Sequence, residues 1–123
     1  MSSVARTVLL IEDNDDAREA VAALLELEGC VVETAAEGVS GIEIVRTKRP
    51  DVALIDIGLP DIDGYEVARR LRSGRVDGGI VLIALTGYGQ TEDQRQALDA
   101  GFDLHLTKPV TPERLAQAIA ALR

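Results

Sequence analysis

The stretch Asp51-Val-Ala-Leu-Ile-Asp56 decides the fold of this chain. An apolar run of this length between charged residues is too short for a helix and is typical of a strand that is buried on both faces. Two more runs have the same character, Thr7-Val-Leu-Leu-Ile11 before it and Ile80-Val-Leu-Ile-Ala-Leu-Thr86 after it. Cys30-Val-Val32 opens another predicted strand, and Phe102-Asp-Leu-His-Leu106 forms the last.

Each predicted strand is followed by a segment whose apolar residues recur at helical spacing. Gly29 ends the first helix, and Pro50 closes the second strand–helix unit. A capping box, Thr91-Glu-Asp-Gln94, begins the fourth helix, and Thr111-Pro112 begins the fifth. The fourth helix has few apolar residues, so we expect it to be weakly anchored. The apolar stripes consist of Ala17, Ala20, Val21, Leu24, Leu25 and Leu27, then Val39, Ile42 and Val45, then Tyr65, Val67, Ala68 and Leu71, then Ala97, Leu98 and Ala100, and finally Leu115, Ile119 and Leu122.

This strict alternation of strands and helices predicts an α/β fold, a doubly wound five-stranded parallel sheet with helices on both faces. We expect the strand order 2-1-3-4-5. The sequence contains no linker or low-complexity segment, so residues 1–123 are predicted to form a single domain.

Composition excludes several classes of function. The chain has 13 basic and 21 acidic side chains, a net charge of -8, and few aromatic residues. Such a chain repels phosphate backbones and anionic membranes and offers little for bases to stack on, so we expect no direct nucleic-acid or membrane binding. The single cysteine, Cys30, excludes an internal disulfide and a cysteine-based zinc site. No long apolar segment or signal peptide is present, which predicts a cytoplasmic location.

Polar side chains stand where the predicted strands end. Glu12 and Asp13 follow the first strand, Asp56 ends the third, Thr86 ends the fourth, and Lys108 follows the fifth. In an open parallel sheet, sites form beyond the carboxyl ends of the strands where the winding reverses, here between strands one and three. We therefore expect the carboxylates to share one crevice, with a hydroxyl and an ammonium group on its far side.

Carboxylates that are held close together repel one another, and desolvation strengthens the repulsion. Either some of them bind protons, or a hard divalent cation binds among them, and oxygen ligands suit Mg²⁺. A carboxylate fixed at the end of a buried strand, as expected for Asp56, can act as a nucleophile toward phosphorus. The cation, Lys108 and Thr86 would then contact the phosphoryl oxygens. Each residue alone has an ordinary structural explanation, so the prediction depends on their combination.

In these features the sequence resembles the receiver domain of two-component response regulators, over nearly its whole length. The resemblance implies a flavodoxin-like fold and a signalling role. Its stretch Ala84-Leu-Thr-Gly-Tyr-Gly-Gln90 also resembles receivers fused to hybrid sensor histidine kinases. The family markers are Glu12-Asp13, Asp56, Leu59-Pro60, Asp63-Gly64, Thr86 and Lys108-Pro109.

The resemblance assigns roles to these residues. It implies that Asp56 is the phospho-acceptor and that Asp13, Asp56 and the backbone carbonyl of Gly58 ligate Mg²⁺. Glu12 is implied to act through water, and Lys108 to contact the phosphoryl group.

Two further roles concern the switch. Thr86 is implied to move toward the phosphoryl group on phosphorylation, and the bond between Lys108 and Pro109 is implied to be cis. The family has an aromatic residue where this chain has His105, which leaves two interpretations open, a structural half-exposed histidine or a side chain that rotates inward.

The implied function is a phosphorelay switch, with self-phosphorylation and slow self-dephosphorylation but no classical enzyme activity. The donor would be a phosphohistidine of a sensor histidine kinase or histidine phosphotransfer domain. The altered surface around helix four, strand five and helix five would be recognised by a downstream protein, a fused domain or a second copy in a phosphorylation-dependent homodimer. The chain is expected to be either free-standing or one part of a longer hybrid kinase.

Three alternatives remain. A pseudo-receiver would bind partners without phosphorylation, which the complete acceptor site disfavours. An aspartyl-phosphate phosphatase resembling the haloacid-dehalogenase group would carry an aspartate where Gly58 stands. A flavin or nucleotide carrier would need a glycine-rich loop after the first strand, where this sequence has an acidic cluster.

Overall fold

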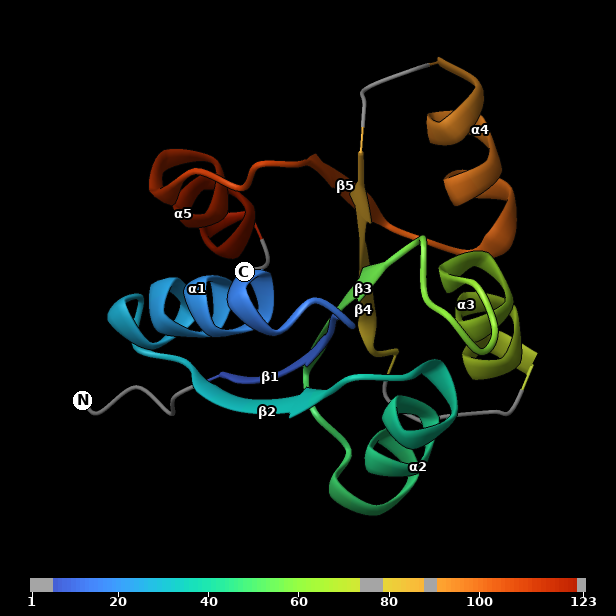
Figure 1. Ribbon diagram of the computed structural model, residues 1–123, viewed down its shortest axis with the longest axis horizontal. Helices are drawn as coiled ribbons and strands as arrows, with labels where there is room; N and C mark the ends of the chain where they lie inside the picture. Colours follow the sequence, from blue (N-terminus) through green and yellow to red (C-terminus); the bar gives the residue numbers. More distant parts are fainter. Residues whose placement is uncertain (1–5, 74–78, 88–90, 122–123) are drawn as a thin grey trace.

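The computed structural model describes residues 6–73, 79–87 and 91–121, with the backbone alone for residues 91–94. Strands and helices alternate through this part of the chain (Figure 1). In chain order the elements are β1 (Thr7–Ile11), α1 (Asp15–Leu27), β2 (Val31–Ala35), α2 (Gly38–Lys48), β3 (Val52–Asp56), α3 (Gly64–Ser73), β4 (Val81–Thr86), α4 (Thr91–Ala100), β5 (Leu104–Thr107) and α5 (Pro112–Ala120).

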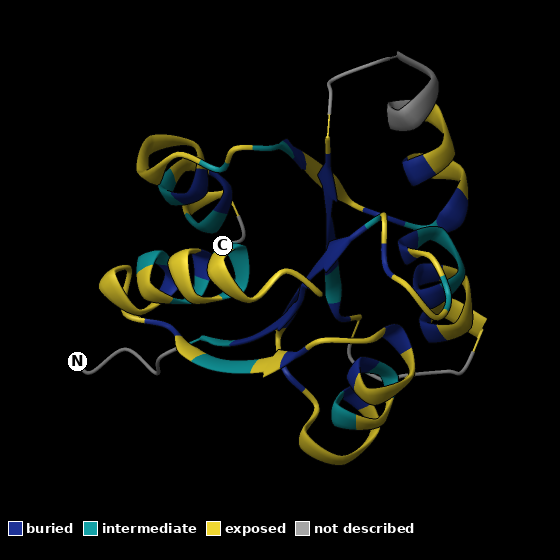
Figure 2. Ribbon diagram, viewed as in Figure 1, coloured by how far each residue is buried: buried dark blue, intermediate teal, exposed yellow. Residues whose placement is uncertain are grey.

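The strands form one parallel sheet in the order β2-β1-β3-β4-β5, which confirms the predicted fold class and strand order. Strand β3 is central, and all of its residues are buried because other strands pair with it on both sides and helices cover both faces (Figure 2). Ile11 pairs with Ile55, and Asp56 pairs with Leu85. The carboxyl ends of β1, β3 and β4 therefore lie side by side.

The helices divide between the two faces of the sheet. Figure 1 shows α1 and α5 on one face and α2, α3 and α4 on the other. Strand residues alternate between these faces, so Val8 and Leu10 of β1 pack with α1 and α5, whereas Leu9 and Ile11 pack with the other helices. The sheet thus separates two buried apolar clusters. Within the described residues, none of the helices has the length and apolar character that crossing a bilayer requires.

Local signals account for the helix ends. Asn14 accepts a hydrogen bond from the Ala17 N–H at 2.8 Å and caps α1, and Gly29 adopts a φ of +87° just beyond that helix. Thr111 caps α5 by accepting from the Arg114 N–H at 3.2 Å, as its sequence predicted. The side chains of the predicted capping box at 91–94 lie outside the described residues, as does Leu122.

Several predicted boundaries are wrong by one or two residues. The second, third and fourth strands each begin one residue later than expected. The fifth strand was expected from Phe102 but begins at Leu104. The Phe102 N–H donates to the Ala97 carbonyl at 3.0 Å, and Gly101 has a φ of +111°. The backbone N–H of Phe102 therefore caps the C-terminal end of α4, and the strand begins only after this residue.

Three of the larger residues assigned to the apolar stripes are exposed in the described part of the chain. The exposed fractions are 82% for Leu27, 55% for Val39 and 66% for Leu98. Each helical residue turns the side-chain direction by about 100°. Leu27 follows the buried Leu25 by two positions and so faces away from the sheet. A short apolar segment cannot by itself show which of its members faces the core.

Candidate functional site

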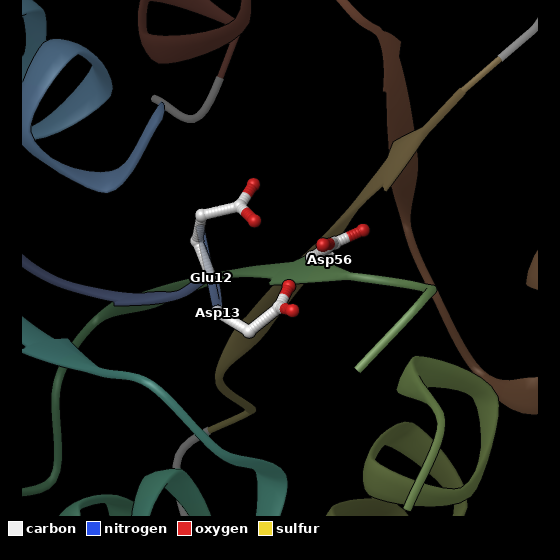
Figure 3. A group of neighbouring side chains, drawn as sticks. All are labelled: Glu12, Asp13 and Asp56. Carbon is white, nitrogen blue, oxygen red and sulfur yellow. The ribbon is translucent and has the colours of Figure 1, made fainter. Parts of the chain in front are cut away.

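The carboxyl ends of β1 and β3 bring three carboxylates together. Glu12 and Asp13 directly follow β1, and Asp56 is the last residue of β3. One oxygen from each lies within 4.8 Å of the others, and Figure 3 shows the three side chains at the adjoining strand ends. Oxygen donors at this spacing are what a hard divalent cation uses. The acidic cluster is therefore compatible with Mg²⁺ binding.

Two of these carboxylates are buried, and a lysine lies between them. Glu12 is 1% exposed and Asp56 is 7% exposed, whereas Asp13 is exposed. The Lys108 Nζ lies 2.9 Å from Glu12 Oε1 and 3.1 Å from Asp56 Oδ2. A buried carboxylate is costly unless it is paired. Lys108, which follows β5, supplies that pairing to both groups.

Backbone groups hold the remaining oxygens of the buried carboxylates. Glu12 Oε2 accepts a hydrogen bond from the Asn14 N–H at 3.1 Å. Asp56 Oδ1 accepts one from the Gly58 N–H at 3.1 Å. Both carboxylates therefore have fixed orientations, each held by a lysine on one oxygen and by a nearby N–H on the other.

The pKa values of the site respond to burial and pairing. Burial raises the pKa of Glu12 above its ordinary 4.5, and the neighbouring Asp56 adds to the rise, although Lys108 and the Asn14 N–H oppose it. For Lys108, burial acts to lower the pKa, but its contacts with Glu12 and Asp56 outweigh burial and raise it above 10.5. The lysine is thus positively charged at neutral pH.

The raised pKa of Glu12 predicts a pH-dependent stability. The folded protein holds the Glu12 proton more tightly than the unfolded chain does, so this contribution is fully present below pH 4.5 and is lost as the pH rises through the folded pKa. We expect Glu12→Gln to remove this fall in the free energy of unfolding with rising pH. Urea unfolding of the variant and the wild type across this pH range, with a chelator present, measures the free energy of unfolding. The exposed Glu19→Gln is the control, and parallel curves for Glu12→Gln and the wild type would contradict the prediction.

Thr86 lies one residue beyond the Leu85 that pairs with Asp56. Its side chain is buried, and its Oγ1 donates to the Leu106 carbonyl at 3.5 Å. The Lys108 N–H donates to the Thr86 carbonyl at 2.7 Å, which places the two residues beside each other at adjoining strand ends. The peptide bond between Lys108 and Pro109 is cis.

The other candidate residues lie at different depths. Gly58 is exposed and sits next to Asp56 in the loop after β3. His105 is exposed on β5, opposite Ala84. Cys30 is a free, buried cysteine.

Sequence reasoning missed Arg18. Its Nη1 donates to the Glu12 carbonyl at 2.8 Å, and its Nη2 pairs with Asp15. These bonds tie the first turn of α1 to the end of β1 and so fix the backbone that carries Glu12 and Asp13. The signal in the sequence is slight, because an arginine among acidic residues in a helix is common.

A cavity of about 520 Å³ adjoins the acidic cluster. On one side its walls are apolar residues of α1, and on the other they are the segment that joins β5 to α5. Glu12 and Lys108 line the same cavity, so it opens onto the ion-paired part of the site. The α1 residues are Ala17, Ala20, Val21 and Leu24.

The fold and the site define a class of protein, parallel α/β domains with an acidic site at the reversal point of the sheet. Comparison with known families specifies the class further. Residues 8–120 match the response regulator receiver domain. The chain belongs to this family. Receiver domains act in two-component signalling as phosphorylation-dependent switches and are not classical enzymes.

Individual relatives agree. The chain is 34% identical over 115 residues to the DNA-binding dual master transcriptional regulator RpaA of Synechocystis, covering 94% of this chain and 48% of that protein. It thus spans about half the length of that relative.

Solved structures show the same fold. Chemotaxis protein CheY4 of Vibrio cholerae is 26% identical with a TM-score of 0.91, covering 98% of this chain and all of that one. The receiver domain of sensor histidine kinase PA1611 of Pseudomonas aeruginosa is 28% identical with a TM-score of 0.88, covering 97% of this chain and 98% of that one. The latter structure has a magnesium ion coordinated in its active-site cleft.

Proposed function

We propose that residues 1–123 form one receiver domain that accepts a phosphoryl group from a phosphohistidine donor onto Asp56 in a Mg²⁺-dependent reaction. The observation that carries this proposal is the meeting of Glu12, Asp13, Asp56 and Lys108 at one place, although they come from three different strand ends. Asp13, Asp56 and the carbonyl of Gly58 would hold the cation, with Glu12 acting through water.

Asp56 is the nucleophile of the proposed reaction. A carboxylate oxygen attacks phosphorus, the bond from phosphorus to the donor's imidazole nitrogen breaks, and the imidazole keeps the electron pair and takes up a proton. When bound, Mg²⁺ supplies positive charge near the phosphoryl oxygens. Lys108 supplies a second positive charge, since its Nζ already lies 3.1 Å from Asp56 Oδ2.

The proposed switch passes from Thr86 toward α4 and β5. The hydrogen bond from Thr86 to the Leu106 carbonyl is long, at 3.5 Å, so its hydroxyl can turn to a phosphoryl oxygen at little cost. Among the described side chains of α4, residues 95–100, only Ala97 and Ala100 are buried, and weakly anchored elements are the ones that move in such transitions. The exposed His105 lies on the surface that would change, together with α5.

The partners follow from the same site. The donor would be a sensor histidine kinase or a histidine phosphotransfer domain, and we propose that it docks on α1, where the apolar cavity opens beside Glu12 and Lys108. The surface altered by phosphorylation would be recognised by a downstream protein, by a fused domain, or by a second copy of the chain in a phosphorylation-dependent homodimer. A cytoplasmic location and the lack of direct nucleic-acid contact by these residues belong to the proposal too, although a relative of twice this length is named as DNA-binding.

Incubation with acetyl phosphate tests the function. With Mg²⁺, intact mass spectrometry is expected to show a gain of one phosphoryl group that hydroxylamine removes, as an acyl phosphate requires. With a chelator, no gain is expected. A chain that never gains mass would be a pseudo-receiver, and continuous release of inorganic phosphate over many turnovers would identify a phosphatase. Either result would overturn the proposal.

A further inference from the structure

The loop from residue 57 to residue 63 joins β3 to α3 and carries Gly58 next to Asp56. It turns back sharply, because the Gly64 N–H donates to the Ile57 carbonyl at 2.9 Å. At the site, the Gly58 N–H donates to Asp56 Oδ1. The position of Gly58 therefore depends on what holds the rest of this loop.

Asp61 fastens the loop to a helix that is distant in sequence. Its Oδ1 accepts from the Gly38 N–H and its Oδ2 from the Val39 N–H, both at 2.9 Å. These N–H groups belong to the first turn of α2, where the backbone offers donors without partners inside the helix. The residue before the helix, Glu37, makes no capping hydrogen bond with its side chain. Asp61 thus supplies the cap that α2 lacks.

Packing accompanies this cap. A Cβ atom on Gly38 would lie 2.8 Å from Ile62 Cγ1 and 2.8 Å from Val67 Cγ2, closer than real Cβ contacts. The start of α2 therefore packs directly on the loop residue next to Asp61 and on α3. Both oxygens of one carboxylate and an apolar contact fix the same short segment, so the loop has little freedom relative to α2.

We propose that Asp61 is a positioning residue for the cation site, because its carboxylate binds α2 and thereby keeps Gly58 beside Asp56. This rests on the proposed function, in which the Gly58 carbonyl and Asp56 hold Mg²⁺. The described hydrogen bonds of the Asp61 side chain go to α2 and not to the acidic cluster. A residue that only capped α2 would affect stability and leave cation affinity unchanged, which makes the two roles separable.

The test compares Asp61→Ala and Asp61→Asn with the wild type. Isothermal titration with MgCl2 gives the affinity, and the NMR signal of the Gly58 amide reports the loop directly. We expect Asp61→Ala to weaken Mg²⁺ binding about tenfold, as losses of residues that orient metal ligands do. Asp61→Asn retains one acceptor oxygen, so its Mg²⁺ affinity is expected to lie between that of the wild type and that of Asp61→Ala. The Gly58 amide signal is expected to shift in both variants even without Mg²⁺.

Thr111→Ala is the matched control, because it removes a side-chain cap from α5 instead of α2. It is expected to lower the midpoint of thermal unfolding about as much as Asp61→Ala does. Its Mg²⁺ affinity is expected to stay within about twofold of that of the wild type. If Asp61→Ala and Asp61→Asn bind Mg²⁺ like the wild type, Asp61 is only a cap and the inference is wrong while the proposed function stands. If the wild type itself binds no Mg²⁺, both are wrong. Should Asp61→Ala fail to fold, Asp61→Asn decides.

Discussion

Asp56→Asn is expected to abolish phosphoryl uptake from acetyl phosphate completely. The amide has nearly the shape of the carboxylate, but its oxygen carries no charge and is a poor nucleophile. Lys108 keeps Glu12 as a partner at 2.9 Å, so the substitution leaves the rest of the site paired. Intact mass spectrometry after incubation with Mg²⁺ and acetyl phosphate measures the effect.

The control for this experiment is Asp99→Asn, an exposed aspartate on α4. It is expected to take up one phosphoryl group as the wild type does. Thermal unfolding of both variants verifies that each is folded. Stoichiometric uptake by Asp56→Asn would show that another side chain is the acceptor, and the role proposed for Asp56 would then have to be abandoned.

Gly64→Ala is expected to destabilise the fold by about 2–3 kcal/mol, the upper part of the range for overpacking. A Cβ atom at this position would lie 2.6 Å from the Asp56 carbonyl oxygen and 2.7 Å from the Ile57 Cα. Both neighbours are backbone atoms, so no side chain can rotate to make room. Because the strain falls on Asp56 and the loop after it, we expect phosphoryl uptake to slow as well. Urea unfolding measures the change in stability.

Gly58→Ala, in the same loop, serves for comparison. There a new Cβ atom would meet only Asp56 Oδ1, at an unstrained 4.0 Å. Its stability is expected to stay within about 0.5 kcal/mol of the wild type, as for surface substitutions without a special contact. Equal unfolding midpoints for the two alanine variants would show that the loop shifts freely around Gly64.

The sequence predicted the framework because the signals for it are local. The apolar run before Asp56 is long enough to identify a buried strand, and parallel strands place their carboxyl ends at one edge. These two facts were sufficient to predict that Glu12, Asp13 and Asp56 would meet. The end of α1 near Gly29 and the cap of α5 at Thr111 could also be predicted from the sequence, because each depends on one residue and its neighbours.

Contacts between distant segments could not be predicted in this way. Arg72 is one example, since its guanidinium donates to the Gly101 and Ile80 carbonyls and pairs with Asp103. Asp61 is another, because its partners lie 22 and 23 residues earlier in the chain. An exposed arginine or a loop aspartate has many potential partners, and the choice among them depends on how the helices sit on the sheet.

The division of the apolar interior by the sheet bears on how this chain tolerates change. Leu25 of α1 and Leu71 of α3 belong to clusters on opposite faces. Free-energy losses from truncating residues that share no neighbours combine nearly additively. Substitutions that repack the cluster beneath α1 and α5 are therefore expected to leave the cluster beneath α2, α3 and α4 undisturbed, so the two sides of one small domain are able to diverge separately.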